Sequence, residues 1–165
     1  VDAGLSFLLS TSYSKSFSLY GERIGSLSVV TASADEAKRV QSQLKIVIRT
    51  NYSNPPTHGA ALVATVLADA ELRAGWEAEL GAMRDRIKSL RRDLVDALAA
   101  RGIADMGFIT TQVGMFSYSG LTREQMVALR EEHAVYGLDS GRMCVAALND
   151  RNLERVADAI AAVRG

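Results

Sequence analysis

Lys15 is the residue whose setting most favours chemistry. It lies in a hydroxyl-rich stretch, residues 10–16 (STSYSKS), directly after an apolar segment. Most lysines are solvated, but an amine that is desolvated beside another cation has a depressed pKa and can form a Schiff base. Arg23 follows between Gly21 and Gly25, and a guanidinium with several hydroxyls matches phosphate oxygens. The pattern therefore predicts a site for a phosphate-bearing aldehyde, which is the chemistry of pyridoxal 5'-phosphate (PLP).

The wider sequence resembles a known family at several points. Residues 12–25 (SYSKSFSLYGERIG) are similar to the PLP-lysine signature of class I (fold type I) aminotransferases of the aspartate/aromatic subgroup. Residues 48–59 (IRTNYSNPPTHG) resemble the subunit-interface segment of that subgroup, and residues 114–121 (GMFSYSGL) and 140–146 (SGRMCVA) resemble two later motifs. The sequence of these motifs is most similar to that of bacterial aromatic-amino-acid (tyrosine) aminotransferases, with aspartate aminotransferase proper as the alternative.

The resemblance implies a role for each matching residue. Lys15 would bind PLP covalently and then move the proton between the substrate Cα and the cofactor. Ser12 and Arg23 would bind the cofactor phosphate. Arg142 would pair with the substrate α-carboxylate, a task that suits a planar guanidinium better than a lysine, and Phe116 would line the pocket beside it.

Two further positions imply a homodimer. Arg49 matches a residue that reaches across the subunit interface to the distal carboxylate of a dicarboxylic substrate, and Ser53 matches one that reaches the partner's phosphate. The resemblance thus implies two composite sites in a symmetric dimer. The expected reaction is transamination between an amino acid, aromatic and also dicarboxylic, and a 2-oxo acid.

The family also uses groups that precede its PLP lysine: an acid on the pyridine nitrogen, a phenol on the ring 3'-oxygen, an aromatic stacked on the ring, and helix amides on the phosphate. Only fourteen residues precede Lys15 here, and the chain begins with Val1 rather than Met. The acid keeps the pyridine protonated so that the ring can accept electrons. We therefore expect a C-terminal portion of an aminotransferase that has no normal PLP site by itself.

Composition excludes several other classes of protein. Lys+Arg and Asp+Glu are 19 each, which argues against a nucleic-acid-binding protein, and no apolar run is long enough to predict a membrane span. The single cysteine, Cys144, fits a reducing, cytoplasmic location and excludes a multi-cysteine metal site. His58 and His133 lack metal-ligand spacing, so no metal is expected. The alternating charges of residues 84–96 predict a solvated helix face.

The first third of the chain predicts two apolar strands, at residues 5–11 and 24–32, both buried in a sheet. A capping box at residues 33–36 (SADE) begins a helix that runs to about Thr50, and the proline pair at 55–56 ends it.

The remaining elements follow from hydrophobic spacing. Apolar residues recur every three or four positions from Leu72 to Leu98 and predict a long helix that ends at Gly102, with Trp76 and the methionines in the core. The other expected elements are a short helix at 60–70, strands at 108–111, 115–118 and 143–148, and helices at 122–133 and 153–163.

This order and the resemblance together indicate an α/β fold, the C-terminal part of a fold type I PLP-dependent transferase. The expected parts are the end of the PLP-binding large domain (residues 1–70), a long linking helix (71–102) and a small α/β domain (103–165).

Two other classes remain as alternatives. Ser12-x-x-Lys15 also fits the S-x-x-K pattern of serine β-lactamases and penicillin-binding proteins, although the S-D-N and K-T-G partner motifs are absent. A non-catalytic α/β module that assembles through its long helix would explain the apolar stripe of that helix. It would leave the Lys15, Arg23, Arg49 and Arg142 motifs without a role.

Overall fold

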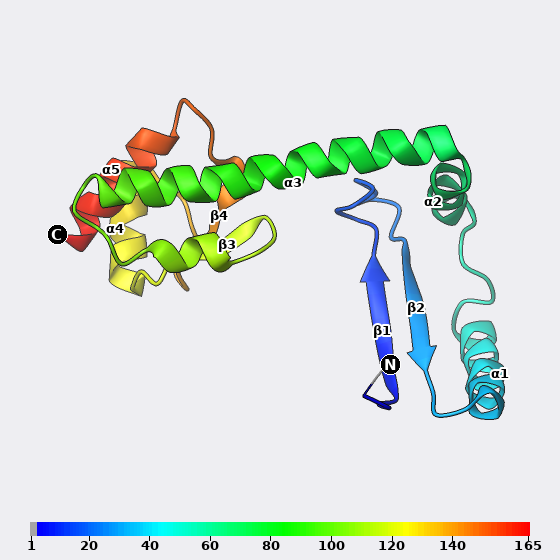
Figure 1. The fold of residues 1–165 in the computed structure, drawn as a ribbon. Coiled ribbons are helices and arrows are strands. Elements are labelled where there is room, and N and C mark those ends of the chain that lie inside the picture. The colour runs from blue at the N-terminus through cyan, green and yellow to red at the C-terminus, as the bar shows by residue number, and fades with distance from the viewer. Residues whose placement is uncertain (1–2) are drawn as a thin grey trace. The chain divides into compact units, whose positions relative to one another are not determined.

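The computed structural model describes residues 3–165 and contains two compact units (Figure 1). The first unit ends at Glu77 and the second comprises Ala78–Gly165. The helix α3 (Ala70–Ala99) begins in the first unit and ends in the second. The two units are described separately below.

The first unit contains a two-stranded antiparallel sheet. Strands β1 (Phe7–Ser12) and β2 (Gly25–Val30) pair in a register that places Ser12 opposite Gly25. A side chain at position 25 is excluded, because its Cβ would lie 2.5 Å from the Thr11 carbonyl oxygen.

The expectation that both strands are buried is wrong. Every residue of β1 is exposed, and only the last two of β2 are half-buried. Apolar residues on successive positions are typical of a strand that is covered on both faces. A two-stranded sheet cannot cover its own faces, so the leucines of β1 remain accessible.

Helices α1 (Ala34–Asn51) and α2 (His58–Ala68) follow the sheet and confirm the predicted helices. The Ser33 hydroxyl accepts the Glu36 N–H, and the Glu36 carboxylate accepts the Ala32 N–H. The first bond satisfies a donor that the helix N-terminus leaves free, and the second fixes the residue before the cap.

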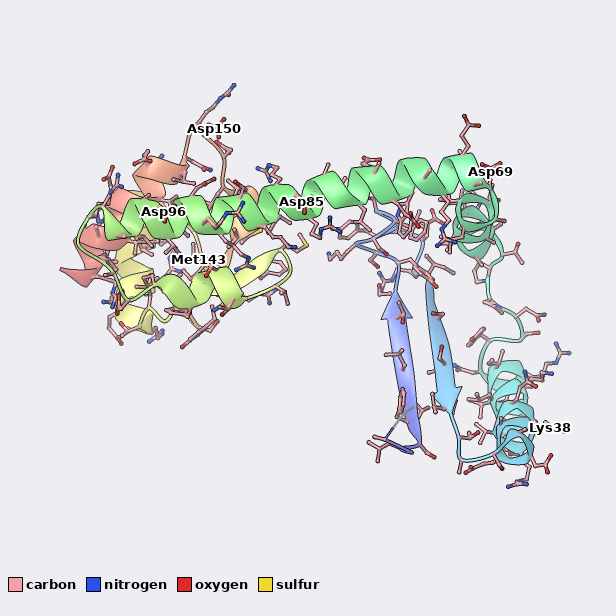
Figure 2. The ribbon with its side chains drawn as sticks, viewed as in Figure 1. Lys38, Asp69, Asp85, Asp96, Met143 and Asp150 are labelled. Carbon is pink, nitrogen blue, oxygen red and sulfur yellow. The ribbon has the colours of Figure 1, made fainter. Side chains whose placement is uncertain are left out.

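Asp69 marks the junction between α2 and α3, where it is labelled in Figure 2. Its carboxylate accepts the N–H groups of Glu71 and Leu72. This cap begins the long helix directly after the short one.

The apolar stripe of α3 is buried only in part. Leu90, Leu94 and Leu98 lie in the core of the second unit, whereas Leu72 and Met83 are about half exposed, so the core placement predicted for the methionines fails at Met83.

The predicted end of α3 is confirmed. Gly102 has φ +84°, and the N–H groups of Gly102 and Ile103 bond to the carbonyls of Ala99 and Leu98. Both hydrogen bonds belong to the Schellman motif, in which glycine adopts the left-handed conformation without a steric penalty.

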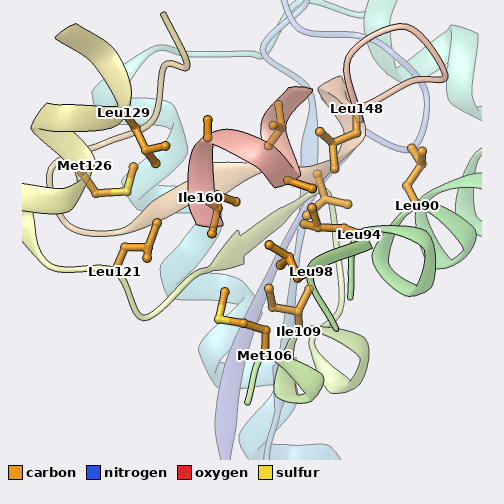
Figure 3. Packing of buried hydrophobic residues seen from close by; sticks show 14 residues of the cluster. Leu90, Leu94, Leu98, Met106, Ile109, Leu121, Met126, Leu129, Leu148 and Ile160 are labelled. Carbon is orange, nitrogen blue, oxygen red and sulfur yellow. The ribbon is translucent and has the colours of Figure 1, made fainter. Parts of the chain in front are cut away.

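The second unit contains strands β3 (Phe116–Tyr118) and β4 (Arg142–Cys144), which pair antiparallel. Helices α4 (Arg123–His133) and α5 (Leu153–Arg164) confirm the two predicted helices. The core joins α3 to these helices, as Figure 3 shows for Leu94, Leu98 and Ile160. Among residues 3–165, no helix is long and apolar enough to cross a membrane.

One predicted strand is wrong, and another is shorter than expected. Residues Gly107–Thr111 form a 3-10 helix, and so do Val145–Ala147, so β4 is shorter than expected. The hydroxyls of Thr110 and Thr111 donate to carbonyls three residues earlier, at 2.7 and 2.8 Å. Such local bonds compete with strand pairing and favour a tight helical turn.

Candidate functional site

The loop between β1 and β2 holds the candidate nucleophile. The Tyr13 N–H bonds to the Ile24 carbonyl at 3.1 Å and closes the base of the loop. Within it, Lys15 Nζ lies 3.8 Å from the centroid of the Tyr20 ring, and the Arg23 guanidinium donates to the Tyr20 carbonyl at 3.0 Å. The loop thus brings the amine and the guanidinium to one residue.

Ser12 lies at the end of β1, where the loop begins. Its hydroxyl donates to Ser14 Oγ at 3.1 Å and accepts the Ser14 N–H at 3.2 Å. Ser12, Lys15 and Arg23 are all exposed, so this chain does not by itself supply the cleft expected around the lysine.

Aromatic residues hold this loop in place. Phe17 stacks on Trp76 with the ring centroids 4.6 Å apart, and Tyr13 packs edge-on against Phe17. Trp76 Nε1 donates to the Ser16 carbonyl at 2.7 Å, next to Lys15. The sequence assigned Trp76 to the core; the structure makes it a half-buried anchor of the lysine loop.

Arg49 and Ser53 form a second group at the end of α1. The Arg49 guanidinium donates to Ser53 Oγ at 2.6 Å, and both residues are exposed. Ser53 has φ +67°, a left-handed conformation that is uncommon for a residue other than glycine. The two residues predicted to act across a subunit interface therefore lie side by side.

Phe116 and Arg142 form the third group, in the second unit. Arg142 Cζ lies 3.9 Å from the Phe116 ring centroid. Arg142 pairs with Tyr118 in the β3–β4 register, so Phe116 and Arg142 lie on the same face of the sheet. A shallow pocket at this face is lined by Phe116, Tyr136, Leu138 and Arg142. The Phe116 ring covers one face of the Arg142 guanidinium. The N–H groups along the edges of that guanidinium are suited to a planar carboxylate.

Arg91 is a buried residue that was not predicted from the sequence. The charged run 84–96 was expected to be solvated, but Arg91 is 2% exposed, and burial lowers the pKa of its guanidinium. It donates to the carbonyls of Gly114 and Phe116, each at 2.8 Å. Arg86 in the same run donates to two carbonyls of the segment after β4. The signal was present, because position 91 lies three residues before Leu94, within the apolar stripe.

The three groups differ in the ligands that they suit. An amine and a guanidinium that contact the same residue, with a hydroxyl where their loop begins, suit an aldehyde that carries a phosphate, so the residues present fit PLP by the chemistry of their donors. The Arg142 and Arg49 guanidinium groups suit carboxylates. Across residues 3–165, no three His, Cys, Asp or Glu side chains gather where they could hold a metal ion.

Comparison with known proteins gives one consistent family. The family profile described as aminotransferase class I and II matches residues 1–160. The chain is 59% identical over 162 residues to an aspartate aminotransferase of Pseudomonas aeruginosa, and 52% identical over 162 residues to the aromatic-amino-acid aminotransferase of Escherichia coli K12. Each alignment covers 98% of this chain and 41% of the relative.

A solved structure agrees with these relatives. The chain is similar, with 64% sequence identity and a TM-score of 0.93, to the aromatic-amino-acid aminotransferase of Burkholderia pseudomallei, which was crystallised covalently bound to pyridoxal phosphate. The match covers 98% of this chain and 41% of that one. The predicted fold class and family resemblance are therefore confirmed, and the chain belongs to the class I and II aminotransferases.

Proposed function

We propose that this chain is the C-terminal part of a longer PLP-dependent aminotransferase. The observation that carries the proposal is the convergence of Lys15 and Arg23 on Tyr20 within one anchored loop. The chain spans about two fifths of the length of its curated relatives, 41% in each case, which fits a portion of such an enzyme. The division into a large-domain end (1–70), a linking helix (71–102) and a small domain (103–165) remains part of this proposal.

The proposed cofactor site is the lysine loop. When bound, PLP supplies an aldehyde that condenses with amines and a ring that accepts electrons from the substrate carbon. Lys15 Nζ is the amine that binds the cofactor and later carries the proton at the substrate Cα. Arg23 and Ser12 bind the phosphate, the guanidinium by charge and the hydroxyl by a hydrogen bond.

The proposed substrate site uses two arginines. Arg142, stacked on Phe116, binds the α-carboxylate that every amino-acid and 2-oxo-acid substrate carries. Arg49 binds the distal carboxylate of a dicarboxylic substrate in the site of the partner subunit. Ser53 binds the phosphate of the PLP in that same site. The enzyme is then a homodimer with composite sites.

Relatives of both kinds are close in sequence, an aspartate aminotransferase at 59% identity and an aromatic-amino-acid aminotransferase at 52%. The proposal therefore includes both aromatic and dicarboxylic amino acids as substrates. It also places the enzyme in the cytoplasm, where the single thiol of Cys144 would stay reduced.

The deciding experiment substitutes Lys15 in the full-length protein. Lys15→Ala should abolish the visible absorbance of lysine-bound PLP and nearly all transamination of tyrosine and aspartate with 2-oxoglutarate. Lys38→Ala is the matched control, because Lys38 is an exposed lysine on α1 that forms an ion pair with the neighbouring Asp35. Full turnover by Lys15→Ala would refute the proposal, whereas loss in both variants would point to misfolding and is checked by circular dichroism.

A further inference from the structure

Arg91 is a buried cation whose described partners are neutral oxygens. Its guanidinium donates to the carbonyls of Ile109 at 3.0 Å and of Gly114 and Phe116 at 2.8 Å, and it also bonds to the Ser117 hydroxyl. Burying a charge is costly unless its donors are satisfied. Here several hydrogen bonds compensate that cost, and all of them end on the segment that leads into β3 and on β3 itself.

Side-chain hydrogen bonds occupy the edge of β3 that does not pair with β4. One edge of β3 pairs with β4, with Ser117 opposite Met143, which is labelled in Figure 2. On the other edge, Arg91 donates to the Phe116 carbonyl, while the Gln112 amide accepts the Tyr118 N–H and donates to the Tyr118 carbonyl, both at 3.0 Å. Two side chains thus satisfy backbone groups that a third strand would otherwise satisfy.

The position of β3 determines how the Arg142 guanidinium is oriented, because the ring on which it stacks belongs to β3. Phe116 and Tyr118 point to the face of the sheet that carries Arg142, and the Arg142 guanidinium rests on the Phe116 ring. A three-residue strand has few hydrogen bonds of its own. A shift of β3 would therefore move the ring on which the guanidinium is oriented.

We infer that Arg91 is a positioning residue for carboxylate recognition, acting through β3 and Phe116 on Arg142. This inference rests on the proposed function, because it assumes that Arg142 binds the substrate carboxylate. Arg91 touches neither substrate nor cofactor in this role. It keeps the stacked pair in one orientation, and a small misplacement of such a group lowers activity strongly.

The test compares neighbouring arginines in the full-length enzyme. Arg91→Met removes the donors and keeps an unbranched side chain, whereas Arg92→Met changes an exposed arginine one position later on the same helix. We expect Arg91→Met to raise KM about tenfold for tyrosine and aspartate alike, with a smaller loss in kcat, and to weaken binding of succinate, a non-reacting dicarboxylate, by a similar factor. Arg92→Met should change neither value.

This readout separates positioning from stability. A purely structural role for Arg91 would reduce the folded fraction, which lowers apparent kcat and leaves KM unchanged; that result would overturn the inference. Arg91→Lys should recover part of the loss, because one ammonium can satisfy some of the same carbonyls. If Arg91→Met does not fold, Gln112→Leu supplies the test, since it frees the Tyr118 edge of β3 and should raise KM about threefold.

A parallel variant distinguishes this inference from the function on which it rests. If Arg142→Lys raises KM for every substrate and Arg91→Met does not, the inference about Arg91 alone is wrong. If Arg142→Lys itself leaves KM unchanged, the carboxylate site is assigned wrongly, and the role of Arg91 is overturned with it.

Discussion

Arg23 and Ser53, two of the three residues that the resemblance assigns to phosphate groups, share an unusual backbone conformation. Arg23 has φ +54° and Ser53 has φ +67°. A residue with a Cβ in this region costs about 1–3 kcal/mol, and such residues gather at functional sites where the surroundings hold them. The hydrogen bonds of Arg23 to Tyr20 and of Arg49 to Ser53 supply part of that support.

The two substrate arginines should respond differently to substitution. Arg142 is proposed to bind the carboxylate common to all substrates, whereas Arg49 is proposed to bind only the second carboxylate of a dicarboxylic one. In the full-length enzyme, Arg142→Lys should lower kcat/KM for both substrate classes. Arg49→Leu should lower kcat/KM for aspartate about tenfold to a hundredfold, the loss of one charged hydrogen-bond pair, and affect tyrosine far less.

Arg39→Leu is the control for Arg49→Leu, because Arg39 is an exposed arginine on the same helix. It should leave both activities intact. Equal losses for aspartate and tyrosine in Arg49→Leu would contradict the role given to Arg49 and would indicate that its bond to Ser53 matters for folding.

At this scale, the motif residues could be predicted. The apolar stripe places Arg91 on the buried face of its helix, but the hydrogen-bond partners of Arg91 could not be predicted. The sequence around Lys15 carries hydroxyls, an arginine and glycines at recognisable spacing. Arg91 lies in a run of alternating charges, where composition favours solvent. Its burial depends on carbonyls 18 to 25 positions away and on the Ser117 hydroxyl, which local spacing does not reveal.

The helices were predictable because residues within a few positions of each end determine where a helix begins and stops. Ser33 and Thr122 cap α1 and α4 through bonds to residues three positions later, and Gly102 ends α3. The short strands were less predictable: β3 lies where a strand was expected, whereas β4 is shorter than expected, because a strand of three residues exists only where a partner pairs with it. Residues 108–111 have strand-like composition, but their threonine hydroxyls bond locally and a 3-10 helix forms.

The end of α3 provides a prediction about stability. Gly102→Ala places a Cβ at φ +84°, where a left-handed residue costs about 1–2 kcal/mol. We expect the midpoint of thermal unfolding to fall by a few degrees, measured by circular dichroism on the full-length protein. Gly107→Ala is the matched control, because an added Cβ there meets nothing within 4 Å and the backbone is not left-handed. An equal shift in both variants would refute the importance of the Gly102 cap.

For the molecule as a whole, composition predicted burial better in one unit than in the other. The hydrophobic share of 48% is enough for a packed core, and in the second unit α3, α4 and α5 supply one. In the first unit, Leu8 is 69% exposed, Leu9 52% and Leu27 51%. The sequence shows that these residues favour burial, but within residues 3–165 they stay accessible.

The exposed sheet therefore predicts opposite effects of one substitution in two contexts. Clusters of accessible leucines bind hydrophobic dyes and promote association, so the isolated 165-residue chain should enhance ANS fluorescence and show no transaminase turnover. Leu8→Lys should lower that fluorescence, because it places a charge on the apolar face. In the full-length protein, where we propose that the rest of the large domain covers β1, the same charge would be buried and should destabilise folding by several kcal/mol. An unchanged unfolding midpoint in full-length Leu8→Lys would show that β1 stays exposed, and the proposal that this chain is part of a larger sheet would then be wrong.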